Sequence, residues 1–139
     1  GSSSLRDIVA QLEMQFRQLS IINEESAEEM MALPDEAAGI IFANLAENAF
    51  QSGAMTLAIE ASNEGRRTTI QVRDNGCGIA DGNRDRIFEP FFSTRRDNGG
   101  TGMGLGIIRA MLASHGGSIE LLESSPAGTT FQIVLPRIS

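Results

Sequence analysis

The sequence contains no lysine, so all 11 of its Lys-plus-Arg cations are arginines. It also has no tryptophan and no tyrosine, and its 7 phenylalanines supply all of the aromatic surface. A single cysteine and a single histidine exclude a disulfide framework and the usual zinc sites, which need several such side chains. No stretch approaches the roughly 18 consecutive apolar residues of a membrane span, and no secretory signal is visible.

Positive charges are also fewer than negative ones, and the formal net charge is −7. A nucleic-acid binder needs a basic stripe that displaces counterions from phosphates, and the sequence has none. We therefore expect no nucleic-acid partner. Any polyanionic ligand must be bound locally, by backbone N–H groups and a few arginines, against an unfavourable overall field.

The length of 139 residues fits one domain with a single hydrophobic core. An apolar fraction of 41% and a charged fraction of 21% are typical of globular proteins. We interpret residues 1–3 as an expression scar and residues 4–139 as the domain itself. We expect this domain to be cytoplasmic, without direct membrane contact of its own, whether or not its parent protein is anchored in a membrane.

Hydrophobic periodicity predicts three helices. Apolar residues at spacings of three and four predict an amphipathic helix over the stretch 4–20, with Ser4 as N-cap and Asp7 three residues later. Pro34 and Asp35 predict the start of a second helix, which Gly53 ends. A third helix is expected over residues 103–114.

Alternating apolar and polar residues predict strands over 55–62, 68–74, 118–124 and 129–136, with a short extended segment at 19–23. Helices and strands do not alternate regularly enough for a doubly wound parallel sheet. The order predicts an α+β fold, a two-layer α/β sandwich in which three helices cover one face of a mixed, mostly antiparallel sheet.

The segment GGTGMGLGIIRA, residues 99–110, joins a glycine-rich turn to an apolar run. A P-loop would need a lysine, which this chain lacks. In a dinucleotide-binding fingerprint the third glycine would fall on Leu105 or Ile107, and a protein-kinase glycine loop would need a second lobe with its own lysine. Two interpretations remain: a hinge whose backbone amides and helix start face phosphate, or a turn that serves packing alone.

Two further segments carry polar side chains at positions where they could contact a ligand. Asn44 and Asn48 lie four residues apart on one face of the second helix, and Gln51 continues the stripe. Amide oxygens suit Mg²⁺, although a solvent-facing stripe would look the same. In DNGCGI, residues 74–79, Asp74 ends a strand and can accept a hydrogen bond from an exocyclic amine, although a simple Asp-Asn-Gly turn is the alternative. Cys77 in this loop is open to alkylation if its thiol is exposed.

The segments NLAENA, DNGCGI, IFEPFFSTR, GTGMGLGI and GTTF occur in one characteristic order and spacing. In this the chain resembles the catalytic ATP-binding domain of sensor histidine kinases, where they are the N, G1, F, G2 and G3 boxes. The resemblance covers about residues 36–136 and extends to the superfamily of gyrase, the Hsp90 chaperones and MutL. It implies the Bergerat, or GHKL, ATP-binding fold, with ATP and Mg²⁺ as cofactors.

The resemblance implies a role for each matched residue. Asn48 would coordinate the Mg²⁺ that bridges the ATP phosphates, and Asp74 would bond the adenine amine. Thr129 would join the hydrogen bonds on the adenine side. The other implied ATP-binding residues are Gln51, Gly76, Gly78, Ile79, Phe92, Gly100, Thr101, Gly102, Met103, Gly104 and Leu105.

The implied catalytic residues are Asn44, Arg95 and Arg96, with one of the arginines approaching the γ-phosphate. Water-activating relatives carry a glutamate at the position of Asn44, and an amide cannot replace that base. The implied reaction is therefore in-line transfer of the γ-phosphoryl group to a histidine, which already carries a lone pair. That histidine would belong to a dimerisation domain of the same parent protein, absent from this chain, and a response regulator would act downstream.

Two alternatives stay open. The first is a degenerate nucleotide-binding signalling module, because Gln51 stands where the family often has a cation and because the glycine-rich lid is short. The other is an anti-sigma-type serine kinase of the same superfamily. The single histidine, His115, follows the third helix and is interpreted as part of its cap rather than as the phosphoacceptor.

Overall fold

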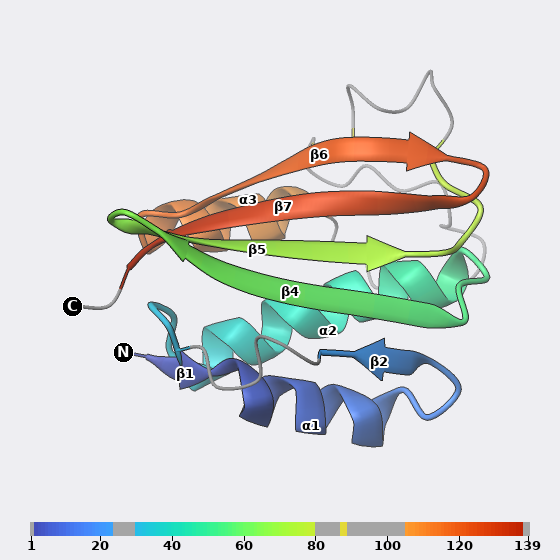
Figure 1. Cartoon of the computed structure of the whole chain (residues 1–139), viewed down its shortest axis with the longest axis horizontal. Coiled ribbons are helices and arrows are strands. Elements are labelled where there is room, and N and C mark those ends of the chain that lie inside the picture. Colours follow the sequence, from blue (N-terminus) through green and yellow to red (C-terminus); the bar gives the residue numbers. More distant parts are fainter. Residues whose placement is uncertain (1, 24–29, 80–86, 89–104, 138–139) are drawn as a thin grey trace.

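The computed structural model describes residues 2–23, 30–79, 87–88 and 105–137. Its elements, in chain order, are β1 (Ser3–Ser4), α1 (Leu5–Gln15), β2 (Ser20–Ile22), β3 (Met30–Met31), α2 (Asp35–Gln51), β4 (Thr56–Glu64), β5 (Arg67–Asp74), α3 (Leu105–Ser114), β6 (Ser118–Ser125) and β7 (Gly128–Pro136). Figure 1 shows α2 and α3 behind the strands of the main sheet, with α1 beside β2.

The main sheet has five strands in the described part of the chain, in the order β2-β4-β5-β7-β6. β2 pairs with β4 in parallel, whereas the β4–β5, β5–β7 and β7–β6 pairs are all antiparallel. The predicted two-layer sandwich with a mixed, mostly antiparallel sheet is therefore confirmed. A separate two-stranded sheet joins β1 to β3.

Strand sequences with a period of two place one face of the sheet against the helices. In β5 the buried side chains are Thr68, Ile70 and Val72, and in β7 the buried set begins at Thr129 and recurs at every second residue. The alternate residues of both strands lie on the opposite, polar face. On that face Gln71 of β5 donates to Gln132 of β7 over 3.3 Å.

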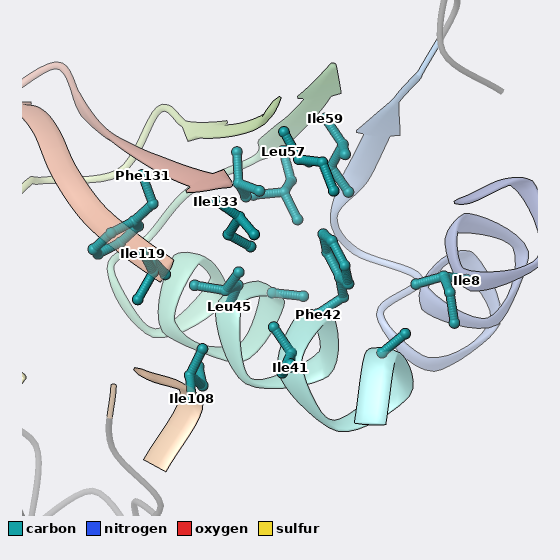
Figure 2. Packing of buried hydrophobic residues seen from close by; sticks show 14 of the residues in the cluster. Ile8, Ile41, Phe42, Leu45, Leu57, Ile59, Ile108, Ile119, Phe131 and Ile133 are labelled. Atoms are coloured by element: carbon teal, nitrogen blue, oxygen red, sulfur yellow. The ribbon is translucent and has the colours of Figure 1, made fainter. Parts of the chain in front are cut away.

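The core forms around α2, whose apolar side chains are spaced for a helix. Phe42 is 1% exposed and Leu45 3% exposed. Figure 2 shows both side chains on the sheet-facing side of α2, toward Leu57 and Ile133. Each large side chain buried in this way contributes about 1.5–3 kcal/mol to folding. The helix is thus held firmly enough against the sheet to position the polar residues that it carries.

The N-terminal part differs from the prediction. α1 ends at Gln15 rather than continuing through the stretch 4–20, because Phe16 leaves the helical conformation with φ −120° and ψ 70°. Ser4 does occupy the N-cap position, but its side chain makes no capping hydrogen bond. Its backbone instead pairs with Met30 in the β1–β3 sheet. Those two-residue strands are too short to have a recognisable sequence pattern.

The remaining elements lie close to their predicted bounds. Gly53 follows the end of α2 with φ 82°, a conformation that glycine adopts without strain, as predicted for a helix terminator. β4 and β5 extend further toward their connecting turn than predicted, because Gly65 adopts φ 62° and allows a tight turn. Residues 103 and 104 of the predicted third helix lie outside the described residues.

Candidate functional site

The candidate site residues that the structure describes lie at one end of the sandwich. The last turns of α2, the carboxyl end of β5 and the start of β7 all reach this end, on the right in Figure 1. The loop that follows β5, residues 75–79, connects them. The predicted residues Asn48, Asp74 and Thr129 therefore belong to one region, although they are far apart in the sequence.

Asp74 and Thr129 are register partners on the adjacent strands β5 and β7. Asp74 is half-buried, and its Oδ1 accepts a hydrogen bond from the Gly76 N–H over 2.8 Å. Thr129 is 5% exposed, and its hydroxyl lies 3.2 Å from that of Ser124 on β6. Ser124 Oγ in turn accepts the Ile79 N–H over 2.7 Å. Carboxylate and hydroxyl groups are thus held in fixed positions at the strand ends.

The loop after β5 is anchored to neighbouring elements by backbone and side-chain hydrogen bonds. Asn75 Oδ1 accepts the backbone N–H groups of Met55 and Thr56, over 2.8 and 3.0 Å, where β4 begins. The Cys77 N–H donates to the Ser52 carbonyl oxygen at the end of α2, over 3.0 Å. These bonds leave the path of the loop little freedom.

Two glycines of this loop have no space for a side chain. A Cβ on Gly76 would lie 2.6 Å from the Ser52 Cβ, a distance that real contacts do not reach. Gly78 adopts φ 82°, and a Cβ there would overlap the carbonyl oxygen of Ser125 on β6. Both predicted pocket glycines therefore allow the backbone to pack closely at this end of the molecule.

The polar stripe of α2 is half-buried, not fully exposed. The Asn44 side-chain amide donates to the Ile40 carbonyl oxygen over 2.8 Å, one helical turn earlier. Gln51 Nε2 donates to Glu47 Oε1 over 3.2 Å. Within the described part of the chain, the Asn48 side chain has no hydrogen-bond partner. Of the stripe, Asn48 is the residue whose amide is best available to a ligand.

Ser52 joins this stripe to the loop. Its backbone N–H and its hydroxyl both donate to the Asn48 carbonyl oxygen, over 3.1 and 2.9 Å. Its own carbonyl oxygen accepts the Cys77 N–H. Neither Ser52 nor Ser124 was predicted from the sequence. Ser52 stands beside the helix-ending Gly53 and could have been noticed as a capping residue, whereas Ser124 carries no such signal.

An aromatic contact joins Phe88 to β7 and α3. The ring of Phe88 meets that of Phe131 edge to face, with centroids 6.3 Å apart. The Arg109 guanidinium of α3 lies 5.6 Å from the Phe88 centroid, within the range of a cation–π interaction. Phe88, from the IFEPFFSTR segment, is thus held between β7 and α3.

Several predicted residues cannot be placed in this site. Leu105 is the first residue of α3 and is 7% exposed, so its side chain packs in the core. The predicted residues that lie outside the described part are Phe92, Arg95, Arg96, Gly100, Thr101, Gly102, Met103 and Gly104.

Three further observations concern the described residues as a whole. Among the described residues, no three His, Cys, Asp or Glu side chains gather where they could hold a metal ion. No helix in the described ranges is long and apolar enough to cross a membrane. A shallow cleft of about 340 Å³, lined by Arg66 and Arg67 among others, lies at the opposite end of β5 from Asp74 and is separate from the site.

Comparison with known sequences identifies related proteins. The family of histidine kinase-, DNA gyrase B-, and HSP90-like ATPases matches residues 35–139. The sensor histidine kinase DpiB of Escherichia coli K12 is 38% identical over 105 residues, which are 70% of this chain and 19% of DpiB. The sensor histidine kinase ZraS of the same strain is 34% identical over 121 residues, 86% of this chain and 25% of ZraS. The chain thus spans a quarter or less of these two relatives.

Solved structures have the same fold. The nucleotide-free catalytic domain of histidine kinase ThkA superposes with a TM-score of 0.81 at 22% identity, covering 99% of this chain and 95% of that one. Full-length ShkA in complex with AMPPNP gives a TM-score of 0.74 at 27% identity, over 97% of this chain and 29% of that one. The chain belongs to the family of histidine kinase-, DNA gyrase B- and HSP90-like ATPases, and its curated relatives are sensor histidine kinases.

Proposed function

We propose that this chain is the ATP-binding catalytic domain of a sensor histidine kinase, which transfers the γ-phosphoryl group of ATP to a histidine on a separate dimerisation domain. The observation that carries the proposal is the link through Ser52. This residue bonds to the backbone carbonyl oxygen of Asn48 on α2 and to the Cys77 N–H in the loop that follows Asp74, so that the helical turn carrying Asn48 and the loop beside Asp74 are held together. The curated relatives DpiB and ZraS are sensor histidine kinases, which supports the same activity.

The Asp74 end of the site is suited to a purine base. A carboxylate can accept a hydrogen bond from the adenine amine, and the neighbouring Thr129 hydroxyl can donate or accept. Gly76 and Gly78 remove side chains from the loop, so that a flat ring can approach its backbone. We assign Asp74, Thr129 and this loop, with Ile79 at its end, to the base.

The Asn48 end is suited to the phosphates and Mg²⁺. Its half-buried amide has no partner among the described residues, and an amide oxygen is a ligand that Mg²⁺ accepts. Magnesium bound with nucleotides usually takes one or two protein ligands, its other positions being filled by phosphate oxygens and water. The chain therefore needs no cluster of acidic ligands. When bound, the ion would neutralise charge on the phosphates.

Other residues are assigned to the phosphates from the resemblance to the family. Arg95 or Arg96 is proposed to approach the γ-phosphate. The segment from Gly100 to Gly104 is proposed to face the triphosphate and to close over it, whereas Leu105, which starts α3, packs its side chain in the core. Gln51, whose amide is bonded to Glu47, would contribute a weaker phosphate contact than a cation does.

The chemistry fits a nucleophile that needs no base. The Asn44 amide donates to the Ile40 carbonyl oxygen and cannot accept a proton at ordinary pH. Its role is therefore to orient neighbouring groups, and it does not activate water as a base. An imidazole nitrogen brings its own lone pair, and the chain then contributes positioning and charge neutralisation. The dimerisation domain, a downstream response regulator and a cytoplasmic location are part of this proposal.

The test combines binding with transfer. ATP should bind when it is titrated into the chain with Mg²⁺ present. Its affinity should be lower after the metal is chelated. Adding the separately produced dimerisation domain of the same parent, with labelled ATP, should give acid-labile phosphohistidine. Binding without transfer would reduce the proposal to a nucleotide-binding signalling module. Phosphoserine on an added antagonist protein would replace it with a serine kinase.

A further inference from the structure

A buried hydroxyl on β6 lies where the loop and β7 meet. We propose that Ser124 is a positioning residue for the nucleotide base: it holds the end of the loop against β6 and fixes the Thr129 hydroxyl in one orientation. This inference rests on the proposed ATP binding and assigns a role to a residue that the sequence pattern does not mark.

The hydrogen bonds of Ser124 support this role. Its Oγ accepts the Ile79 N–H over 2.7 Å and lies 3.2 Å from Thr129 Oγ1. Ser124 and Thr129 are each 5% exposed, so water has little access to the contact between their hydroxyls. A hydroxyl can accept one hydrogen bond and still take part in a second as donor or acceptor. Ser124 therefore couples the loop backbone to the Thr129 side chain.

A β-bulge brings Ser124 to this position. The register of β6 against β7 shifts between Leu121 and Glu123, which leaves Leu122 as an extra residue. If the regular pairing continued from Leu121, Glu123 would stand opposite Thr129. The shift places Ser124 there instead and leaves Glu123 exposed.

The side chain opposite Thr129 is a hydroxyl and not a carboxylate, and this matters because Asp74 lies on the other side of Thr129. Thr129 pairs with Ser124 on one side and with Asp74 on the other, so the three residues form a row across β6, β7 and β5. A buried glutamate in the Ser124 place would put a second negative charge about 10 Å from Asp74, two strand spacings away. Burial of an unpaired charge is costly, whereas a hydroxyl can satisfy its neighbours. Because the bulge places Ser124 in the row in the position that Glu123 would otherwise take, the row contains one carboxylate, that of Asp74.

The loop also lies directly on this part of β6. A Cβ on Gly78 would overlap the Ser125 carbonyl oxygen and would lie 3.1 Å from Ser124 Oγ. No side chain separates the loop backbone from the strand. A small displacement of Ser124 would therefore displace the loop that we assign to the base.

The first experiment compares Ser124→Ala with Ser118→Ala, which removes an exposed hydroxyl from the other end of the same strand. ATP and GTP are titrated by displacement of a fluorescent ATP analogue, with Mg²⁺ present. Because the half-buried Ile79 N–H loses its acceptor, Ser124→Ala should weaken ATP binding about 10-fold. The preference for ATP over GTP should fall, and Ser118→Ala should match the wild type. Equal weakening of both nucleotides would indicate a purely structural role and would overturn the inference, as would unchanged ATP affinity.

A second measurement does not depend on nucleotide or on the folding of the variant. Hydrogen exchange of the Ile79 amide is followed in the wild-type chain without ligand, and in Ser124→Ala where it folds. The bond to Ser124 predicts a protected amide in the wild type and faster exchange in the variant. An unprotected Ile79 amide in the wild type overturns the inference. A wild type that binds no ATP but protects Ile79 would refute the proposed function and leave the anchor itself standing.

Discussion

The backbone of Gly128 lies against the carbonyl oxygen of Asp74, with no space for a Cβ between them. Gly128 begins β7 with φ 148°, a conformation that favours glycine. This contact brings the turn between β6 and β7 onto the end of β5. Thr129, the next residue of β7, pairs directly with Asp74, so this close contact lies beside the two side chains that we assign to the base.

Gly128→Ala should destabilise the chain and also disturb the site. The unfavourable backbone conformation costs about 1–3 kcal/mol, and the overlap with Asp74 adds about 1–3 kcal/mol. Gly65→Ala is the control, because Gly65 has φ 62° but open space around it, so that only the conformational cost applies. Urea unfolding measures both variants. Equal losses of stability in the two would contradict the close packing at Asp74.

Phe42 and Phe50 offer a second matched pair on α2. Phe42 is 1% exposed and Phe50 is 45% exposed. Phe42→Ala leaves a cavity in the core and should cost about 3–5 kcal/mol. Phe50→Ala should change the free energy of unfolding by less than about 1 kcal/mol, since its side chain is largely in water. Comparable losses in thermal or urea unfolding would show that the core is not centred on α2.

The helix α2 and the strands from β4 to β7 were predictable because each follows one period over most of its length. The two-residue strands β1 and β3 were not, since such short segments have no period to detect. α1 ended early because Phe16 and the residues after it turn the chain back toward β2. Local pattern therefore predicts the large elements and misses what tertiary packing decides.

The same limit applies to the site. Asn48, Asp74 and Thr129 could be selected from their motifs, but their connection through Ser52 could not, because it joins segments far apart in the chain. Ser124 was hidden by the bulge at Leu122, since alternation along β6 points to Glu123 as the inward residue. A break in strand period is visible only in the paired structure.

Cys77 provides a test of where ATP binds. It is the single cysteine of the chain, its thiol is exposed, and its backbone is fixed to Ser52 beside the two pocket glycines. Saturating ATP and Mg²⁺ should slow its alkylation by iodoacetamide, because a bound base would cover this loop. Mass spectrometry follows the rate, with Mg²⁺ alone as control. An unchanged rate, at an ATP concentration shown to bind, would place the base elsewhere.

Asn48→Ala should separate stability from function. The Asn48 side chain has no hydrogen-bond partner among the described residues, and alanine is the better helix former, by roughly 0.7 kcal/mol. The variant should therefore be as stable as the wild type or slightly more so. If the amide is a ligand for Mg²⁺, ATP affinity should fall about 10-fold or more, in the range expected for lost contacts to a charged group. The gain in affinity that Mg²⁺ gives the wild type should shrink with it, as calorimetry with and without chelator would measure.

Gln132→Ala, which removes a half-buried amide from the polar face of the sheet, should leave ATP binding unchanged. A stable Asn48→Ala variant with full Mg²⁺-dependent affinity would show that the helix carries this amide for another reason.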